Sequence, residues 1–167
     1  MMFSHMLMKY IENNNLSVHL HVNYELKPSN FSVMKDFSSR LDNAVTYLRN
    51  ELYLKREWFP EMDLIITENK PPFSFCVEFK YYHYFPTTWD VVNDLKRKIV
   101  ILNTLKKYEV CKDAGIFLLD DGICRKDEKL CNEIRSVLDE GNPSLMVLNR
   151  HITYEELLTV LHKYSTF

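Results

Sequence analysis

The sequence predicts a single α/β domain, in which helices flank a central mixed β-sheet in three layers. Segments with the two-residue period of strands alternate with segments whose apolar residues recur every three to four positions, as in helices. The chain has 167 residues, which suits one domain, and its 46% hydrophobic content excludes a disordered chain. We therefore expect one domain over residues 1–167.

The elements expected in the first half follow from periodicity and from breakers. Strict alternation of apolar and polar residues over 17–26 predicts a half-buried strand, which Pro28 ends. The apolar stripe from Phe37 to Leu52 predicts a long helix. The expected elements are, in order, helix 2–12, strand 17–26, helix 31–53, a short strand 55–58, strand 62–67 and strand 73–82.

The second half is interpreted in the same way. Thr87 is the expected cap of a helix whose core stripe runs from Val92 to Leu102. A continuous apolar run before Asp120 predicts a buried strand, and Gly141 ends the helix that follows. The expected elements are helix 88–108, strand 114–119, helix 126–139, strand 144–148 and a last helix over 153–164.

The composition excludes several function classes. The only glycines, Gly115, Gly122 and Gly141, are too widely spaced for a phosphate-binding loop. The net charge of 21 − 23 = −2 argues against a protein that coats nucleic acid non-specifically. No apolar run is long enough to span a membrane, so we expect no membrane partner. The start lacks the features of a signal peptide and no C-x-x-C pair occurs, which favours a reduced, cytoplasmic protein.

Three charged residues of the strand-rich segment carry the functional argument. In strand 73–82, alternation places Glu78 and Lys80 on one face and Val77 and Phe79 on the other. Asp63 lies at the start of the preceding strand, which should be its antiparallel neighbour. Two carboxylates that converge beside a lysine can hold a hard cation such as Mg²⁺, which takes one or two carboxylates and keeps water for a substrate phosphate.

The order Asp63, a fifteen-residue gap, then Glu78-Phe79-Lys80 resembles the PD-(D/E)xK nuclease superfamily, which has the restriction-endonuclease-like fold. The resemblance covers about residues 31–120, with a helix and strand added before this core and a helix, strand and helix after it. It implies a Mg²⁺-dependent nuclease, in which Mn²⁺ could substitute. Asp63 and Glu78 would bind the metal, and Lys80 would position or activate the attacking water.

The sequence departs from the family pattern in places. Pro60 lies three residues before Asp63 rather than next to it, and no unmistakable acidic motif marks the first core helix. Further site candidates are therefore drawn from that helix, from the approach to the Asp63 strand and from the helix after the Lys80 strand. They are Asp42, Glu51, Glu57, Glu61, Asp94 and Lys98. For each, a solvated helix face or a simple ion pair is the alternative interpretation.

Three functions remain open at this point. The first is the metal-dependent nuclease, a phosphodiester hydrolase with DNA or RNA as its partner, of which DNA is favoured. A homodimer could then help an acidic chain to hold its substrate, with phosphate contacts from 96–98, 106–107 and 55–56. The second is a non-catalytic module that binds nucleic acid or protein and keeps the same fold. The third is an interaction protein of unrelated α/β fold, in which Glu78 and Lys80 form a structural ion pair.

Overall fold

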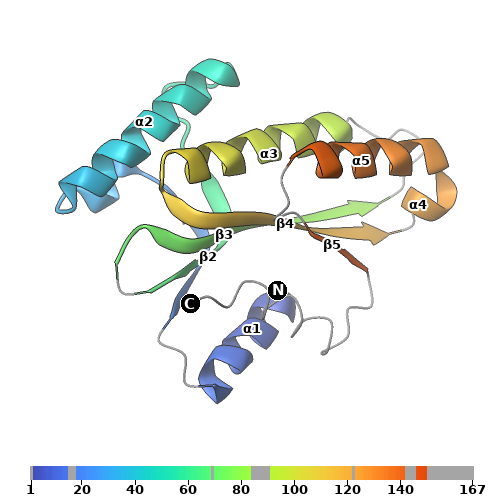
Figure 1. The fold of residues 1–167 in the computed structure, drawn as a ribbon, viewed down its shortest axis with the longest axis horizontal. Coiled ribbons are helices and arrows are strands. Elements are labelled where there is room, and N and C mark those ends of the chain that lie inside the picture. Colours follow the sequence, from blue (N-terminus) through green and yellow to red (C-terminus); the bar gives the residue numbers. More distant parts are fainter. Residues whose placement is uncertain are drawn as a thin grey trace.

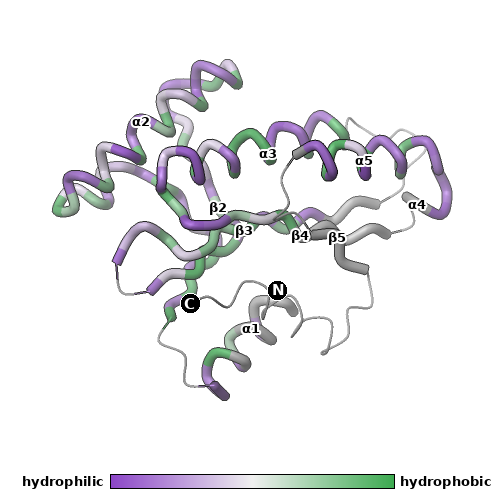
Figure 2. Tube along the Cα trace, in the orientation of Figure 1, coloured by the Kyte–Doolittle hydropathy of each residue, from purple (hydrophilic) through white to green (hydrophobic). Residues whose placement is uncertain are grey.

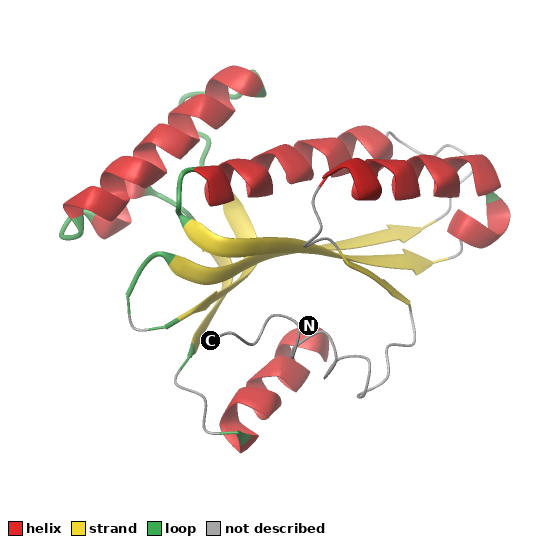
Figure 3. Cartoon of the chain, viewed as in Figure 1, coloured by secondary structure: helices red, strands yellow, loops and turns green. Residues whose placement is uncertain are grey.

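In the computed structural model, residues 2–14, 18–68, 70–83, 91–121, 123–141 and 146–149 are described. They form a mixed five-stranded sheet in the order β1-β2-β3-β4-β5, together with helices (Figures 1 and 3). The elements are α1 (Met2–Asn13), β1 (His19–Glu25), the 3-10 turn η1 (Pro28–Phe31), α2 (Lys35–Glu51), β2 (Glu61–Thr67), β3 (Phe73–His83), α3 (Val91–Lys107), β4 (Cys111–Asp121), α4 (Ile123–Lys126), α5 (Glu128–Gly141) and β5 (Met146–Asn149).

The sheet combines an antiparallel half and a parallel half. β1, β2 and β3 are antiparallel neighbours, whereas β4 is parallel to β3 and β5 is parallel to β4. A parallel pair needs a crossover, and α3 provides it between β3 and β4. The α/β class and the mixed sheet expected from the sequence are thus confirmed.

Helices lie on both sides of the sheet. Figure 1 shows α2, α3 and α5 along one face, and α1 on the opposite side. The core between the sheet and helices α2, α3 and α5 includes Leu41, Leu95 and Leu138 from the helices and Ile65 and Ile116 from the strands. Figure 2 shows hydrophilic and hydrophobic residues alternating along these helices, as expected when one helix face packs on a core.

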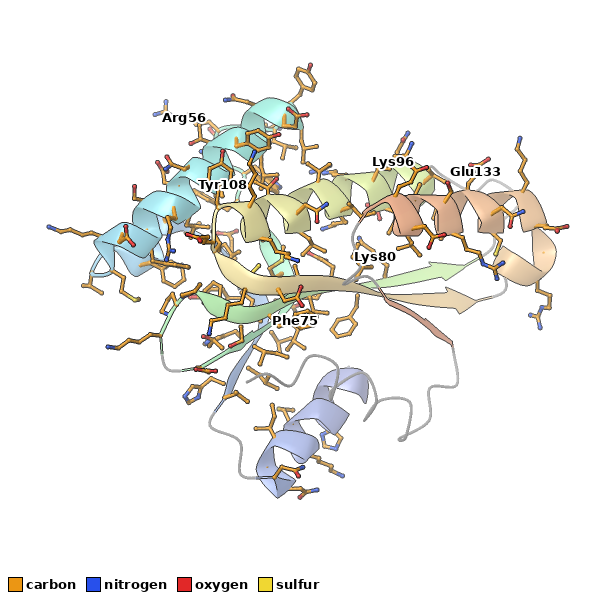
Figure 4. The ribbon with its side chains drawn as sticks, in the orientation of Figure 1. Arg56, Phe75, Lys80, Lys96, Tyr108 and Glu133 are labelled. Carbon is orange, nitrogen blue, oxygen red and sulfur yellow. The ribbon has the colours of Figure 1, made fainter. Side chains whose placement is uncertain are left out.

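The opposite sheet face is also apolar. Leu64, Ile66, Phe75 and Val77 are buried but do not belong to the core under α2, α3 and α5. In Figure 4, Phe75 lies on the side of the sheet that faces α1. Phe73 differs from the strict alternation expected for its strand. Phe73 is the first residue of β3, and its ring packs against Phe31 and Phe37 in the helical layer.

Several expected elements need correction. Residues 55–58 do not form a strand: the Trp58 N–H donates to the Lys55 carbonyl (3.1 Å), which makes a turn. The helix expected over 126–139 is interrupted at Asp127, whose carboxylate accepts the Leu130 N–H (3.0 Å) and caps α5. The strand expected over 114–119 extends over Cys111–Asp121 because its pairing with β3 continues along its whole length.

Other expected elements are confirmed or fall outside the described residues. The long second helix is confirmed as Lys35–Glu51, with a separate 3-10 turn before it. Thr87 and the last helix over 153–164 lie outside the described residues. Cys131 is disulfide-bonded, contrary to the reduced chain expected from the sequence. Among the described helices, none combines the length and the apolar character that crossing a membrane requires.

Candidate active site

The site lies where β2 separates from β3. The antiparallel register between these strands runs from Ile66 opposite Phe75 to Leu64 opposite Val77, where the pairing ends. One residue further, the Asp63 carboxylate accepts the backbone N–H of Phe79 at 2.7 Å. The side chain thus replaces a ladder hydrogen bond at the point where the ladder stops, which satisfies the Phe79 N–H and fixes the Asp63 carboxylate beside β3.

Glu78 is the buried acid of the site. It lies on the central strand β3, is only 2% exposed, and its carboxyl group hydrogen-bonds with Asp63. Burial raises the pKa of Glu78 to about 8, and the bond to Asp63 adds to the rise, while Lys98 opposes it. At pH 7 a carboxyl group with this pKa is about nine-tenths protonated. The protonated Glu78 carboxyl group can then donate its O–H to Asp63, which is consistent with the hydrogen bond between the two side chains.

Two lysine–carboxyl contacts connect this strand to α3. The Lys80 ammonium lies 3.2 Å from Asp94 Oδ2, and the Lys98 ammonium lies 3.5 Å from Glu78 Oε1. Residues two apart on a strand are separated by roughly 6.5 Å along it. Residues four apart on a helix are separated by roughly 6 Å along its axis.

These matching spacings let both pairs form at once. Because α3 is the crossover between parallel strands, it runs back against β3, so the later strand residue meets the earlier helix residue. Both Glu78 and Lys80 consequently face α3, and Figure 4 shows Lys80 between the sheet and the helical layer. The row formed by Asp94 and Lys98, which local spacing alone interprets as a helix pair, contacts the strand instead.

The charges of the cluster nearly balance. With all groups ionised, the three acids Asp63, Glu78 and Asp94 and the two lysines Lys80 and Lys98 sum to −3 + 2 = −1. The proton on Glu78 brings this sum to zero. A divalent cation that displaces the proton would find two converging carboxylates, which is the number of protein ligands that Mg²⁺ commonly uses.

The donor set suits Mg²⁺ rather than a metal that needs a full protein cage. Within the described residues, no three His, Cys, Asp or Glu side chains come together in a way that could hold a metal ion. Asp63 and Glu78 offer hard oxygen ligands only, and further positions would have to be filled by water and substrate oxygens. The residues present therefore fit a hydrated Mg²⁺ or Mn²⁺ held by two carboxylates.

A pocket of about 560 Å³ opens beside the cluster. Lys80, Asp94 and Lys98 line it, whereas Asp63 and Glu78 are not among its lining residues. The pocket is lined by Glu25, Glu57, Trp58, Phe59, Pro60, Glu61, Met62, Lys80, Asp94, Arg97, Lys98 and Ile101. The pocket therefore carries both acidic and basic side chains of the cluster and of its surroundings.

The structure brings most of the sequence candidates together. Asp63, Glu78, Lys80, Asp94 and Lys98 form the cluster described above. The two other acids proposed near the Asp63 strand also belong to this region, since both line the pocket. They are Glu57 and Glu61.

Two candidates lie elsewhere. Asp42 and Glu51 are exposed on α2 and do not line the pocket. Sequence reasoning missed Trp58, which lines the pocket, and Arg49, which donates from Nε to the Trp58 carbonyl at 2.9 Å. An arginine in the last turn of a helix shortly before an aromatic pair was the only sequence signal for this contact.

Comparison with protein-family models, with curated proteins and with solved structures returns no match to this chain.

Proposed function

We propose that this protein is a Mg²⁺-dependent nuclease that hydrolyses phosphodiester bonds in DNA or RNA. The observation that carries the proposal is the hydrogen-bonded pair Asp63 and Glu78 at the separation of two antiparallel strands, with Lys80 on the same face. The restriction-endonuclease-like arrangement expected from the motif is part of this proposal. Its support is the antiparallel β2–β3 pair, followed by the α3 crossover and the parallel strand β4.

The residues of the cluster have distinct tasks. Asp63 and Glu78 would hold the cation, and Glu78 must release its proton to do so. Bound Mg²⁺ would supply the positive charge that polarises a phosphoryl group and favours the ionisation of water. Lys80, held by Asp94, would donate to the attacking water or to the phosphate oxygens as negative charge develops. Lys98 offsets the charge of Glu78 when its proton leaves.

A cleavage assay tests this proposal. Purified protein is incubated with plasmid, single-stranded DNA and RNA in Mg²⁺ or Mn²⁺, with EDTA as the metal-free control. We expect cleavage that EDTA stops and that Lys80→Ala reduces by about 10²- to 10⁴-fold, the usual contribution of a positioned proton-transfer group. Lys35→Ala is the matched control, because Lys35 is exposed at the start of α2 and does not line the pocket. Equal loss in both variants, or cleavage by Lys80→Ala at the wild-type rate, would contradict the proposal.

A non-catalytic binding module is the second candidate, and one observation favours it. Both lysines of the cluster already have carboxylate partners within the chain, Lys80 with Asp94 and Lys98 with Glu78. Such pairs can serve the packing of α3 on the sheet without any ligand. If the wild type binds nucleic acid or protein but cleaves nothing in either metal, this function replaces the nuclease.

A further inference from the structure

The pocket beside the carboxylate cluster has an aromatic wall that the nuclease chemistry itself does not use. The wall is the loop before β2, from which Trp58, Phe59 and Pro60 line the pocket. The pocket's volume of about 560 Å³ lies in the range of sites that hold small organic ligands, about 300–1,000 Å³. Aromatic side chains in such a site can stack on a planar ligand.

Contacts from neighbouring elements hold this wall in place. Arg49 of α2 donates to the Trp58 carbonyl at 2.9 Å, and its guanidinium lies 4.7 Å from the centre of the Phe59 ring. The Leu26 N–H donates to the Pro60 carbonyl at 2.7 Å, which ties the loop to the end of β1. The loop is therefore fixed before any ligand binds, and a fixed surface loses little entropy when it binds.

The two aromatic rings have different roles. Phe59 carries two cations over its ring, Arg49 and Lys27, the latter at 5.5 Å from the ring centre. Within the described part of the chain, Trp58 has no such cation and no ring partner. Trp58 is partly buried against the hydrophobic core and also lines the pocket. Its indole is therefore the ring of this wall that can stack on a ligand.

The charged lining suits a nucleotide. Lys80, Lys98 and the exposed Arg97 supply cations for a phosphate group on the α3 side. Glu57 and Glu61 are exposed acids on the loop side, and carboxylates accept hydrogen bonds from the amino groups of bases. In a duplex, by contrast, base faces are stacked and paired, so they cannot reach a pocket wall.

We infer that Trp58 is a stacking residue for an unpaired nucleobase and that the substrate is single-stranded nucleic acid. This inference rests on the proposed function for the scissile phosphate, which would lie at the lysines while the base occupies the pocket. Stacking of one base on an aromatic side chain contributes about 1–3 kcal/mol. Loss of the indole should therefore weaken binding by about 5- to 150-fold.

Intrinsic fluorescence tests the inference without requiring cleavage. The chain has two tryptophans, Trp58 and Trp89, so a Trp89→Phe protein reports on Trp58 alone. One mixed 15-nucleotide sequence is titrated as single-stranded DNA, single-stranded RNA and duplex DNA, in Ca²⁺ and in EDTA. We expect a single-stranded form to quench Trp58 and to bind at least about tenfold more tightly than the duplex, in line with one stacked base.

Variants separate stacking from general effects. By fluorescence anisotropy of labelled oligonucleotide, Trp58→Ala should lose 5- to 150-fold in affinity, while Trp58→Phe, which keeps a ring, should lose less. Lys35→Ala is the charge control, because Lys35 is exposed at the start of α2 and does not line the pocket. Wild-type affinity in Trp58→Ala, equal affinity for duplex and single strands, or no binding in either buffer would overturn the inference.

The outcomes also distinguish this inference from the proposed function. If single strands bind through Trp58 but Mg²⁺ produces no cleavage, the inference stands and the nuclease proposal fails. If duplex and single strands are cleaved alike and replacement of Trp58 changes neither, the inference fails while the nuclease proposal stands.

Discussion

Replacing Glu78 by glutamine should make the protein more stable in alkaline solution. Glutamine has nearly the same shape as the protonated carboxyl group but cannot ionise. The pKa of Glu78 is raised from 4.5 to about 8 in the folded protein, so the folded state binds this proton more tightly than the unfolded state does. Wild-type stability must then fall as the pH rises through this window, and Glu78→Gln removes that loss.

The magnitude follows from linkage. Well below pH 4.5 the carboxyl group is protonated in both states and contributes no pH dependence. Well above pH 8 the whole destabilisation that follows from the pKa difference between the folded and unfolded states is present. The shift of 8 − 4.5 = 3.5 pH units corresponds to about 5 kcal/mol as an upper limit, of which about 4 kcal/mol develops between pH 5 and pH 9. This is a large part of the roughly 5–15 kcal/mol by which native proteins are stable.

Urea unfolding followed by circular dichroism at several pH values measures this difference. The control is Glu133→Gln, because Glu133 is an exposed acid on α5 (Figure 4). Between pH 5 and pH 9 the wild type should lose about 4 kcal/mol more than Glu78→Gln, while Glu133→Gln should follow the wild type. Parallel pH profiles for wild type and Glu78→Gln would refute the raised pKa of the buried Glu78.

Three further predictions follow from contacts in the structure. Asp63→Asn removes a charged ligand and should weaken Mn²⁺ binding, measured by calorimetry at pH 8, by at least about 10- to 100-fold, because losing even an outer-shell partner of a metal has this effect. Equal Mn²⁺ affinities of Asp63→Asn and of the control Asp36→Asn, at an exposed residue, would contradict this. Lys98→Met removes the cation that lowers the pKa of Glu78, so a carbon-13 NMR titration should place the Glu78 pKa above about 8; an unchanged value would show that the pair is not formed. Asp127→Ala removes the cap of α5 and should lower the free energy of unfolding by about 1 kcal/mol, whereas the exposed Asp139→Ala should have little effect.

Local patterns in the sequence predicted the part of the site that lies on strands. Alternation places Glu78 and Lys80 on one face, and a turn between two strands places Asp63 beside them, because both rules depend only on neighbours in the chain. The structure brings these residues together as expected. The helix that follows could also be predicted from the sequence, since its apolar stripe defines which side packs on the sheet.

The remaining features depend on how elements pack in three dimensions. Spacing alone cannot tell whether Asp94 and Lys98 pair with each other along α3 or with β3, because that choice depends on the direction and height of the helix over the sheet. Residues 55–58 were expected to form a strand, yet they form a turn, and Arg49 in the last turn of α2 donates to the Trp58 carbonyl. By contrast, the break at Asp127 had a local signal, since aspartate is a preferred cap three residues before Leu130.

The central claim is that Asp63 and Glu78 together bind a divalent cation. Crystals soaked with millimolar Mn²⁺ at pH 8, where about half of Glu78 has lost its proton, test this claim most directly through the anomalous scattering of manganese. The account predicts one strong anomalous peak in contact with both carboxylates, with water in the other positions. A map without a peak at these two residues, or with manganese only at exposed acids such as Glu51, would contradict it.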